Sequence, residues 1–326
     1  MTLAWVVGSR GLLGTALCSA LARAGTTLFA PTQRLAWTDR SELAAQIAAG
    51  VRAFAAQAAS SDRWEIYWAA GIGTMSTSEA DLIPETAALA LLLGLAADEP
   101  ALMAVAGGVA LASSAGAIYA GSTQELVTEA TPVGPTTDYA REKIRQERLM
   151  SAFTQASPRV RVLNARLSTL YGAGQSPGKK QGLLSSIARA MLRNHPIQIF
   201  VPYDTIRDYL HVDDAAERTI AALRAAAAEE PQMVMRIIAS ERSTTIAEIV
   251  SVFKRVAKRP PRIVTSTSAV SRLYARKVQF QSVVSVHSNK IVNKSLVIGI
   301  AQLLANERAV LVRCGLPLHV LDKRNG

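Results

Sequence analysis

The chain has little cysteine and little histidine. Of its 326 residues only two are cysteines, Cys18 and Cys314, and they are far apart in the sequence. The four histidines show no metal-ligand spacing and lie at His195, His211, His287 and His319. These absences argue against a disulfide framework and against a metal centre, and they fit a protein of the reducing cytoplasm.

The sequence also lacks a clear export or membrane segment. Its N-terminus has an apolar run of only about six residues without a basic leader, which is too short for a signal peptide. Residues 100–121 carry no charge and would be long enough to cross a bilayer, but Gly, Ser and Ala dilute them. Because parallel strands covered on both faces read as continuous apolar runs, we expect a buried strand here.

Acidic residues are scarce near the C-terminus. Residues 251–326 contain 14 Lys and Arg against two acids, Glu307 and Asp322, whereas the first 250 residues are close to neutral. Such a segment could attract nucleic acid, anionic lipid or a phosphorylated small molecule. Its few aromatics form no stacking series and no nucleic-acid motif is present, so we expect no DNA or RNA binding. Peripheral contact with an anionic membrane stays an open hypothesis.

The first 170 residues alternate short apolar runs with helix-length segments. In order, these read LAWVVG, LGTALCSALARAG, TTLFAP, SELAAQIAAGVRAFAAQAA, WEIYWAAG, ALALLLGLAA, ALMAVAGGVALASS and VRVLNARLSTLYG. Strands separated by helices pair in parallel, and the crossovers place helices on both faces of the sheet. The pattern predicts an α/β fold with a doubly wound parallel sheet of the Rossmann type.

From about residue 172 this rhythm gives way to loops that contain Gly and Pro. We therefore expect a dinucleotide-binding domain over residues 1–171, to which residues 207–240 return. Residues 172–206 and 241–326 would form a smaller, irregular C-terminal substrate domain. A break of this kind leaves a crevice at the carboxyl ends of the strands, where ligands of open α/β sheets bind.

A glycine array follows the first expected strand directly. The stretch VVGSRGLLG places Gly8, Gly11 and Gly14 between a strand and a helix. Glycines at this point allow a tight turn, so that a pyrophosphate can approach the N–H groups at the helix start, around Leu12 and Leu13. The array predicts dinucleotide binding.

The acidic residue that usually holds the adenosine ribose about 20 positions later is missing. The second expected strand runs instead into Pro31, Thr32, Gln33 and Arg34. A 2′-phosphate could be bound by Arg34, together with Arg10 of the glycine loop. NADP is therefore expected in preference to NAD, which mildly favours a reductase.

The stretch TTDYAREKIRQERL sets Tyr139 four residues before Lys143 in an expected helix. Residues at this spacing share a helix face, so the ammonium of Lys143 would lie near the phenol of Tyr139. A cation favours the phenolate form, which suits a tyrosine that acts as general base or acid. Spacing alone is weak support, because such pairs occur often in Lys-rich helices.

Six motifs occur in an order that resembles one family. They are GSRGLLG, WAAG at residues 68–71, SSAGAIYA, YAREK, ARLSTLYGAGQ and RDYLHVDDAA. Together, from residue 3 to about residue 250, they resemble the extended short-chain dehydrogenase/reductases, which include nucleotide-sugar epimerases, dehydratases and ketoreductases. The resemblance implies that Tyr139 exchanges a proton with a sugar hydroxyl or ketone, that Lys143 holds the nicotinamide ribose, and that the cofactor is lined by Ala69, Ala70 and Gly71.

The resemblance also implies further site residues. Ser114 would be the third catalytic residue and contact the substrate, although the spacing slips by one and Ser113 is the alternative. Asp39 corresponds to the position that contacts adenine, and it could equally be a helix cap. Substrate contacts would come from Thr169, where relatives often have Asn, and from Arg207, which would bind the diphosphate. Arg272 or Arg276 would supply a second diphosphate contact.

The resemblance leaves the reaction open among several activities. The acidic pair that sugar dehydratases carry after their Ser or Thr is replaced here by small apolar residues, so dehydration is disfavoured. We expect an NAD(P)-dependent oxidoreductase acting on a nucleotide-diphosphate sugar, as a 4-ketoreductase or 4-epimerase. The alternative is a non-catalytic, redox-sensing NADP-binding regulator, although such proteins usually lose the Tyr/Lys pair. A homodimer through a four-helix bundle is expected by resemblance, with YAREKIRQERLM in one of its helices.

Overall fold

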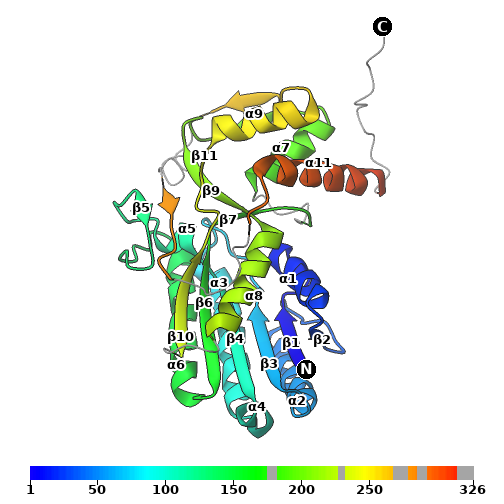
Figure 1. Cartoon of the computed structure of the whole chain (residues 1–326), viewed down its shortest axis with the longest axis vertical. Helices are drawn as coiled ribbons and strands as arrows, with labels where there is room; N and C mark the ends of the chain where they lie inside the picture. The colour runs from blue at the N-terminus through cyan, green and yellow to red at the C-terminus, as the bar shows by residue number, and fades with distance from the viewer. Residues whose placement is uncertain (175–181, 227–231, 267–277, 285–291, 314–326) are drawn as a thin grey trace.

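A computed structural model describes residues 1–174, 182–226, 232–266, 278–284 and 292–313. Its centre is a six-stranded sheet in the order β10-β6-β4-β3-β1-β2, in which every neighbouring pair is parallel (Figure 1). The strands are β1 (Thr2–Val7), β2 (Thr27–Phe29), β3 (Arg63–Trp68), β4 (Ala106–Ser114), β6 (Val160–Leu167) and β10 (Met233–Ile238). The expected parallel α/β sheet is confirmed.

Helices cover both faces of this sheet. Because successive strand residues point to opposite sides, each strand contributes side chains to a core on either face. On β1, Leu3 and Trp5 face a core formed with α2 (Arg40–Ala58), α3 (Glu79–Ala97) and α6 (Asp138–Ala156). Ala4 and Val6 face the other core, formed with α1 (Leu12–Arg23) and α8 (Val212–Ala226). The strand is therefore buried on both sides, which explains its continuous apolar sequence.

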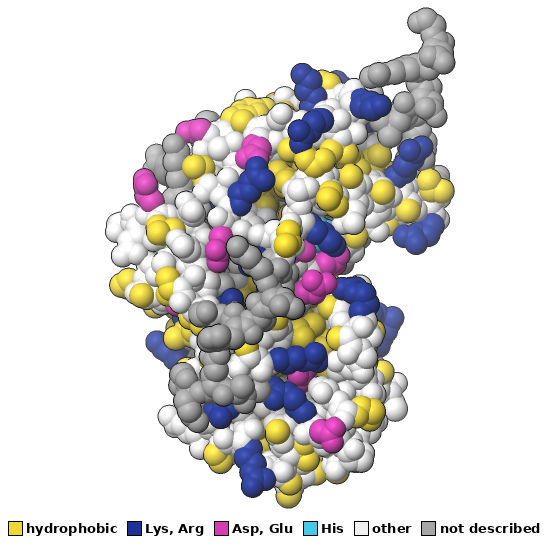
Figure 2. Space-filling view, viewed as in Figure 1, with side chains coloured by type: hydrophobic (Ala, Val, Ile, Leu, Met, Phe, Trp, Pro, Cys, Tyr) yellow, Lys and Arg dark blue, Asp and Glu magenta, His cyan; other side chains and the backbone are white. Residues whose placement is uncertain are grey.

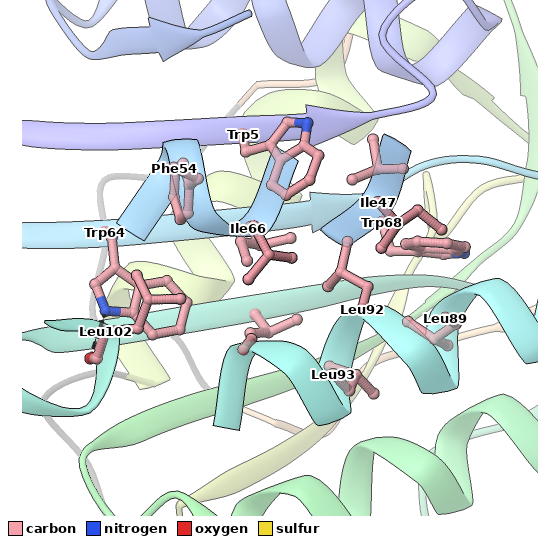
Figure 3. Close-up of a cluster of buried hydrophobic side chains, with 14 of the residues drawn as sticks. Trp5, Ile47, Phe54, Trp64, Ile66, Trp68, Leu89, Leu92, Leu93 and Leu102 are labelled. Carbon is pink, nitrogen blue, oxygen red and sulfur yellow. Dashed lines mark hydrogen bonds between the residues drawn. The ribbon is translucent and has the colours of Figure 1, made fainter. Parts of the chain in front are cut away.

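Large aromatic side chains fill the first of these cores (Figure 3). The rings of Trp5 and Phe54 lie 5.7 Å apart, and Phe54 meets Trp64 edge to face at 6.2 Å. The indole of Trp64 donates a hydrogen bond of 2.9 Å to the carbonyl of Leu102, which satisfies its buried N–H. Burial of these rings fixes α2 and α3 on the sheet.

Residues 100–121 form a short helix, α4 (Pro100–Ala104), followed by β4, so the expectation of a buried strand is confirmed. Among the described residues one helix, α3, is long and apolar enough to cross a membrane, with a mean hydropathy of 1.6. Helices of a protein core meet the same criterion, and α3 contacts both α2 and α6.

The remaining elements gather at the carboxyl ends of the strands (Figure 1). A three-stranded sheet joins β11 (Ser243–Thr245), β9 (Ile206–His211) and β7 (Thr169–Tyr171). A separate apolar core lies between the helices α7 (Leu183–Leu192), α9 (Ile246–Ala257) and α11 (Leu296–Arg313). Smaller elements are α5 (Ala115–Ile118) and two strand pairs, β8 (Ile197–Ile199) with β12 (Ile263–Thr265) and β5 (Leu126–Val127) with β13 (Gln279–Phe280). This core shares no residue with the two cores of the main sheet, and the expected division into two domains stays a prediction.

Candidate active site

The glycine loop between β1 and α1 forms a tight backbone cradle. Gly8 has a φ of +87°, and a β-carbon built on it would lie 2.5 Å from the backbone nitrogen of Ala70. The N–H of Gly11 donates to the carbonyl of Gly8 at 2.9 Å, which closes the turn. Among the described residues no side chain caps the start of α1, so the N–H groups of its first turn suit an anionic ligand. A nicotinamide dinucleotide, with its pyrophosphate at these groups, fits this loop.

The loop after β3 lies beside the glycine loop. The N–H of Ala69 donates to the carbonyl of Val7 at 2.9 Å, so Ala69 continues the pairing of β3 with β1, and Ala70 follows beside Gly8. A β-carbon on Gly73 would lie 2.7 Å from Cδ2 of Tyr139. The WAAG segment thus connects the glycine cradle to the tyrosine.

The two arginines expected to select NADP lie near the surface. Arg10 and Arg34 are exposed, and neither makes a hydrogen bond or ion pair within the described part of the chain. Asp39 accepts a hydrogen bond of 3.0 Å from the N–H of Glu42 and caps α2. This cap accounts for Asp39 without a ligand, so its expected adenine contact remains a prediction.

Tyr139 lies in the first turn of α6, which begins after its N-cap Thr137. Lys143 is one turn further along, and its ammonium nitrogen lies 5.8 Å from the centre of the Tyr139 ring. Tyr139 is partly exposed, whereas Lys143 is only 5% exposed. The structure therefore brings the expected pair together on one helix face, with Tyr139 partly exposed and Lys143 buried.

Within the described part of the chain, the Lys143 ammonium has two direct hydrogen-bond partners. It donates to Oε1 of Glu85 on α3 at 3.2 Å and to Oε1 of Gln146 at 2.9 Å. Burial by itself would lower the pKa of Lys143, but the charge and hydrogen bond of Glu85, with Glu147 further away, outweigh burial and raise it. Lys143 therefore remains protonated over the neutral range.

Ser113 and Ser114 have different surroundings. The buried hydroxyl of Ser113 donates to Glu147 at 2.7 Å, and Glu147 forms an ion pair of 2.6 Å with Arg166. Ser114 is the N-cap of α5, and its oxygen accepts a hydrogen bond of 3.4 Å from Ala117. A hydroxyl that accepts in this way retains its own proton for donation. Ser114 is thus the better candidate to contact a substrate, because the hydroxyl of Ser113 already donates its proton to Glu147.

Thr169 and Arg207 lie on the neighbouring strands β7 and β9. Thr169 is exposed and pairs with Tyr209 of β9. Tyr209 lies two residues after Arg207 on the same strand, and Arg207 is half-buried. Residues at this spacing on a strand share a face. Arg272 and Arg276 fall outside the described residues, so their expected diphosphate contacts remain predictions.

Asp208, the residue after Arg207 on β9, anchors this strand through hydrogen bonds. Asp208 is buried and accepts hydrogen bonds of 2.9 Å from both the N–H and the hydroxyl of Ser240. Burial raises the pKa of Asp208, although the hydrogen bonds from Ser240 oppose that rise. Asp213 lies inside the first turn of α8, where it forms an ion pair with Lys294. Both contacts hold the RDYLHVDD segment in place.

The sequence of residues 4–237 matches the NAD dependent epimerase/dehydratase family. The matched residues include the glycine cradle, the Tyr139–Lys143 pair and Arg207. The chain belongs to this family. The resemblance to extended short-chain dehydrogenase/reductases is confirmed.

Individual relatives are distant. A putative UDP-glucose 4-epimerase from Methanocaldococcus jannaschii is 29% identical over 115 residues, which are 35% of this chain and 37% of that protein. Two solved structures share the fold at 18% identity and a TM-score of 0.71 each. One is MoeE5 in complex with UDP-glucuronic acid and NAD, matched over 95% of this chain and 100% of that one. The other is UDP-glucose 4-epimerase from Bifidobacterium longum with NAD+ and UDP, matched over 95% and 98%.

One residue of this epimerase/dehydratase-family site was missed by the sequence reasoning. Glu85 contacts Lys143 directly, yet it lies 58 residues earlier in the chain. A signal was present, because Glu85 is the one charged residue in the apolar stretch LIPETAALALLLGLAA, residues 82–97. Among the described residues no group of three or more His, Cys, Asp or Glu side chains could hold a metal ion.

Proposed function

We propose that the chain binds NAD and acts as a 4-epimerase on a nucleotide-diphosphate sugar, oxidising a sugar hydroxyl to a ketone and then reducing that ketone. The observation that carries this proposal is the Tyr139–Lys143 pair. The loop after β3 connects this pair to the glycine cradle, because Ala70 packs against Gly8 and Gly73 packs against Tyr139. The alternative within the same chemistry is a 4-ketoreductase, which would use the same side chains.

NAD is the better candidate cofactor. The family description and the solved structures in complex with NAD support it, whereas the comparisons give no support to the NADP preference expected from Arg34. An epimerase that retains NAD also needs no exchange of cofactor between turnovers. The sequence favoured reduction only through the expected NADP preference. Without that preference we propose epimerisation.

Each side chain has a proposed role. Bound NAD would supply the acceptor for the hydride. Tyr139 would take the proton of the sugar hydroxyl and return it later, because its phenol is partly exposed beside a fixed cation. Lys143 would hold the ribose and stabilise the phenolate, and Ser114 would donate a hydrogen bond to the reacting sugar oxygen. Thr169 would lie beside the sugar, and Arg207 would bind the diphosphate through its guanidinium.

The first experiment is to denature the purified protein and identify any released dinucleotide by mass and absorbance. The protein is then assayed with UDP-glucose, UDP-galactose and UDP-glucuronic acid for epimerisation, and with a UDP-4-keto sugar and NADH or NADPH for reduction. Retained NAD with epimerisation supports the proposal, and Y139F is expected to lower kcat by about 10²–10⁴. Preference for NADPH with net reduction would favour the ketoreductase. Dinucleotide binding without turnover would favour the redox-sensing regulator.

We propose a homodimer in which α3 and α6 of two protomers pair. The two helices contact each other, and beyond its first turn α3 exposes apolar side chains, among them Ile83 at 46%. Light scattering after size exclusion is expected to give twice the monomer mass, and I83E should give the monomer. A wild-type monomer would contradict this assembly.

The basic surface near the C-terminus is a proposed contact for anionic lipid. Figure 2 shows Lys and Arg side chains around apolar patches over α7, α9 and α11. Lys254, Arg255 and Lys258 are exposed at the end of α9. Sedimentation with phosphatidylglycerol vesicles at low salt tests this contact, with phosphatidylcholine vesicles as the control. Sedimentation with neither would remove the proposal.

A further inference from the structure

Glu85 is a buried carboxylate in an otherwise apolar part of α3. It is 6% exposed, whereas the helix's other acidic residues, Glu79 and Asp81, lie exposed in its first turn. A buried carboxylate is unfavourable unless it is paired and hydrogen-bonded. Glu85 therefore needs hydrogen-bond partners, and these lie on α6 and in the loop after β3.

Both oxygens of Glu85 are used. Oε1 accepts from the Lys143 ammonium at 3.2 Å and from Nε2 of Gln146 at 3.1 Å. Oε2 accepts from the backbone N–H of Ile72 at 3.3 Å. Gly71 leaves room for this carboxylate, because a β-carbon there would lie 2.9 Å from Oε1. One side chain thus joins α6 to the loop that follows β3.

That loop is itself part of the site. Ala70, at its start, contacts Gly8 of the dinucleotide cradle, and Gly73 lies against the Tyr139 ring. A displacement of Ile72 would therefore move the surfaces that border both the cradle and the phenol. Glu85 is positioned to hold these parts in one arrangement.

We infer that Glu85 is a positioning residue, whose carboxylate fixes the Lys143 ammonium behind Tyr139 and, through Ile72, fixes the loop that packs on the phenol. The inference deepens the proposed function and rests on it. It assigns to this chain a buried counter-ion that sets the charge of the catalytic lysine.

The other charged groups around Lys143 do not replace Glu85. Tyr139 and Glu147 on α6 also act on the ammonium electrostatically, but Glu147 is already paired with Arg166 of β6 and accepts from Ser113. Arg166 in turn contacts the hydroxyl of Tyr119 at the end of α5. Glu85 is therefore the carboxylate in direct contact with Lys143. Its neutralisation would leave a buried ammonium without an adjacent negative charge, and the pKa of Lys143 would fall.

The decisive variant is Glu85→Gln, which keeps the size of the side chain and removes its charge. Its control is Glu79→Gln on the same helix, since Glu79 is exposed and pairs with the exposed Arg145 at 2.6 Å. Glu85→Asp keeps the charge but draws the carboxylate back by one methylene. All three variants are first checked for native circular dichroism.

The first readout needs neither cofactor nor turnover. Trace acetylation of Lys143 with acetic anhydride, measured by mass spectrometry over a pH series, reports the protonation midpoint of this lysine. The midpoint is expected to fall by about one pH unit or more in Glu85→Gln and by less in Glu85→Asp. It should stay unchanged in Glu79→Gln. An unchanged midpoint in folded Glu85→Gln, or in folded Glu85→Asp where the Gln variant does not fold, would overturn the inference.

The second readout is the pH profile of kcat for the nucleotide-sugar reaction. The loss of activity at high pH, as Lys143 deprotonates, is expected to move down by the same interval in Glu85→Gln, with little change in KM. If wild-type protein shows no turnover, the proposed function fails while the acetylation result still tests the Glu85–Lys143 contact. If wild-type protein is active and the variant's profile does not move, the inference fails and the proposed function stands.

Discussion

Gly73 lies directly against the ring of Tyr139, because a β-carbon built on Gly73 would fall 2.7 Å from Tyr139 Cδ2. The same β-carbon would lie 2.7 Å from a methyl group of Leu82 on α3. The space around the phenol is thus closed on the loop side by backbone, and a larger residue at position 73 must displace Tyr139 or Leu82. A catalytic group displaced by even about 1 Å loses much of its rate advantage.

We expect Gly73→Ala to fold but to lower kcat by about tenfold or more, because the added methyl group shifts the phenol from its working position. Steady-state kinetics and circular dichroism check both parts. The matched control is Gly94→Ala on α3, where an added β-carbon would meet nothing within 4 Å. A normal kcat in folded Gly73→Ala would show that the loop yields without moving Tyr139.

Gly8→Ala is expected to weaken dinucleotide binding by about tenfold or more, because the new β-carbon would collide with the backbone of Ala70 and distort the cradle. Isothermal titration with NAD measures the effect. Gly25→Ala is the control, since Gly25 also has a positive φ, of +71°, but has nothing within 4 Å of an added β-carbon. Equal affinity in both variants would contradict the assigned role of Gly8.

Arg166→Met is expected to destabilise the fold by about 3–5 kcal/mol, because it leaves the buried carboxylate of Glu147 without its ion-pair partner. The side chains of this pair are only 5% and 8% exposed. Urea unfolding of Arg23→Met provides the comparison, since the Arg23–Glu217 pair is 58% and 46% exposed. The loss in that control should be about 1 kcal/mol or less. Similar losses in both variants would contradict a buried, tightly coupled pair.

His211 is expected to make the protein less stable toward acid. Burial lowers the pKa of His211 from its ordinary value of 6.5, and the nearby Lys294 acts in the same direction. Between the folded and unfolded pKa values the unfolded chain binds more protons, so stability is complete above about 6.5 and is lost as pH falls below it. Melting temperatures from pH 8 to pH 5 should therefore converge with, or fall below, those of His211→Gln. A constant difference across that range would contradict a buried, neutral imidazole.

Much of the site could be predicted because its signals are local. The glycine spacing around Gly8 requires only one turn, and Tyr139 and Lys143 share a helix face through their separation of four residues. Spacing along the sequence does not separate Ser114 from Ser113. The structure distinguishes them by their partners, since Ser113 donates to Glu147 from across the core.

The sequence by itself determined the alternation of strands and helices, the glycine turn and the Tyr139–Lys143 pair, because each depends on neighbours within a few residues. Only the tertiary structure decided the strand order of the sheet and the partners of the charged groups. Glu85 reaches Lys143 across 58 residues of chain, and Arg166 reaches Tyr119 across 47. Such contacts arise when separate helices and strands are buried together, where a charge left without a partner is too unfavourable to persist.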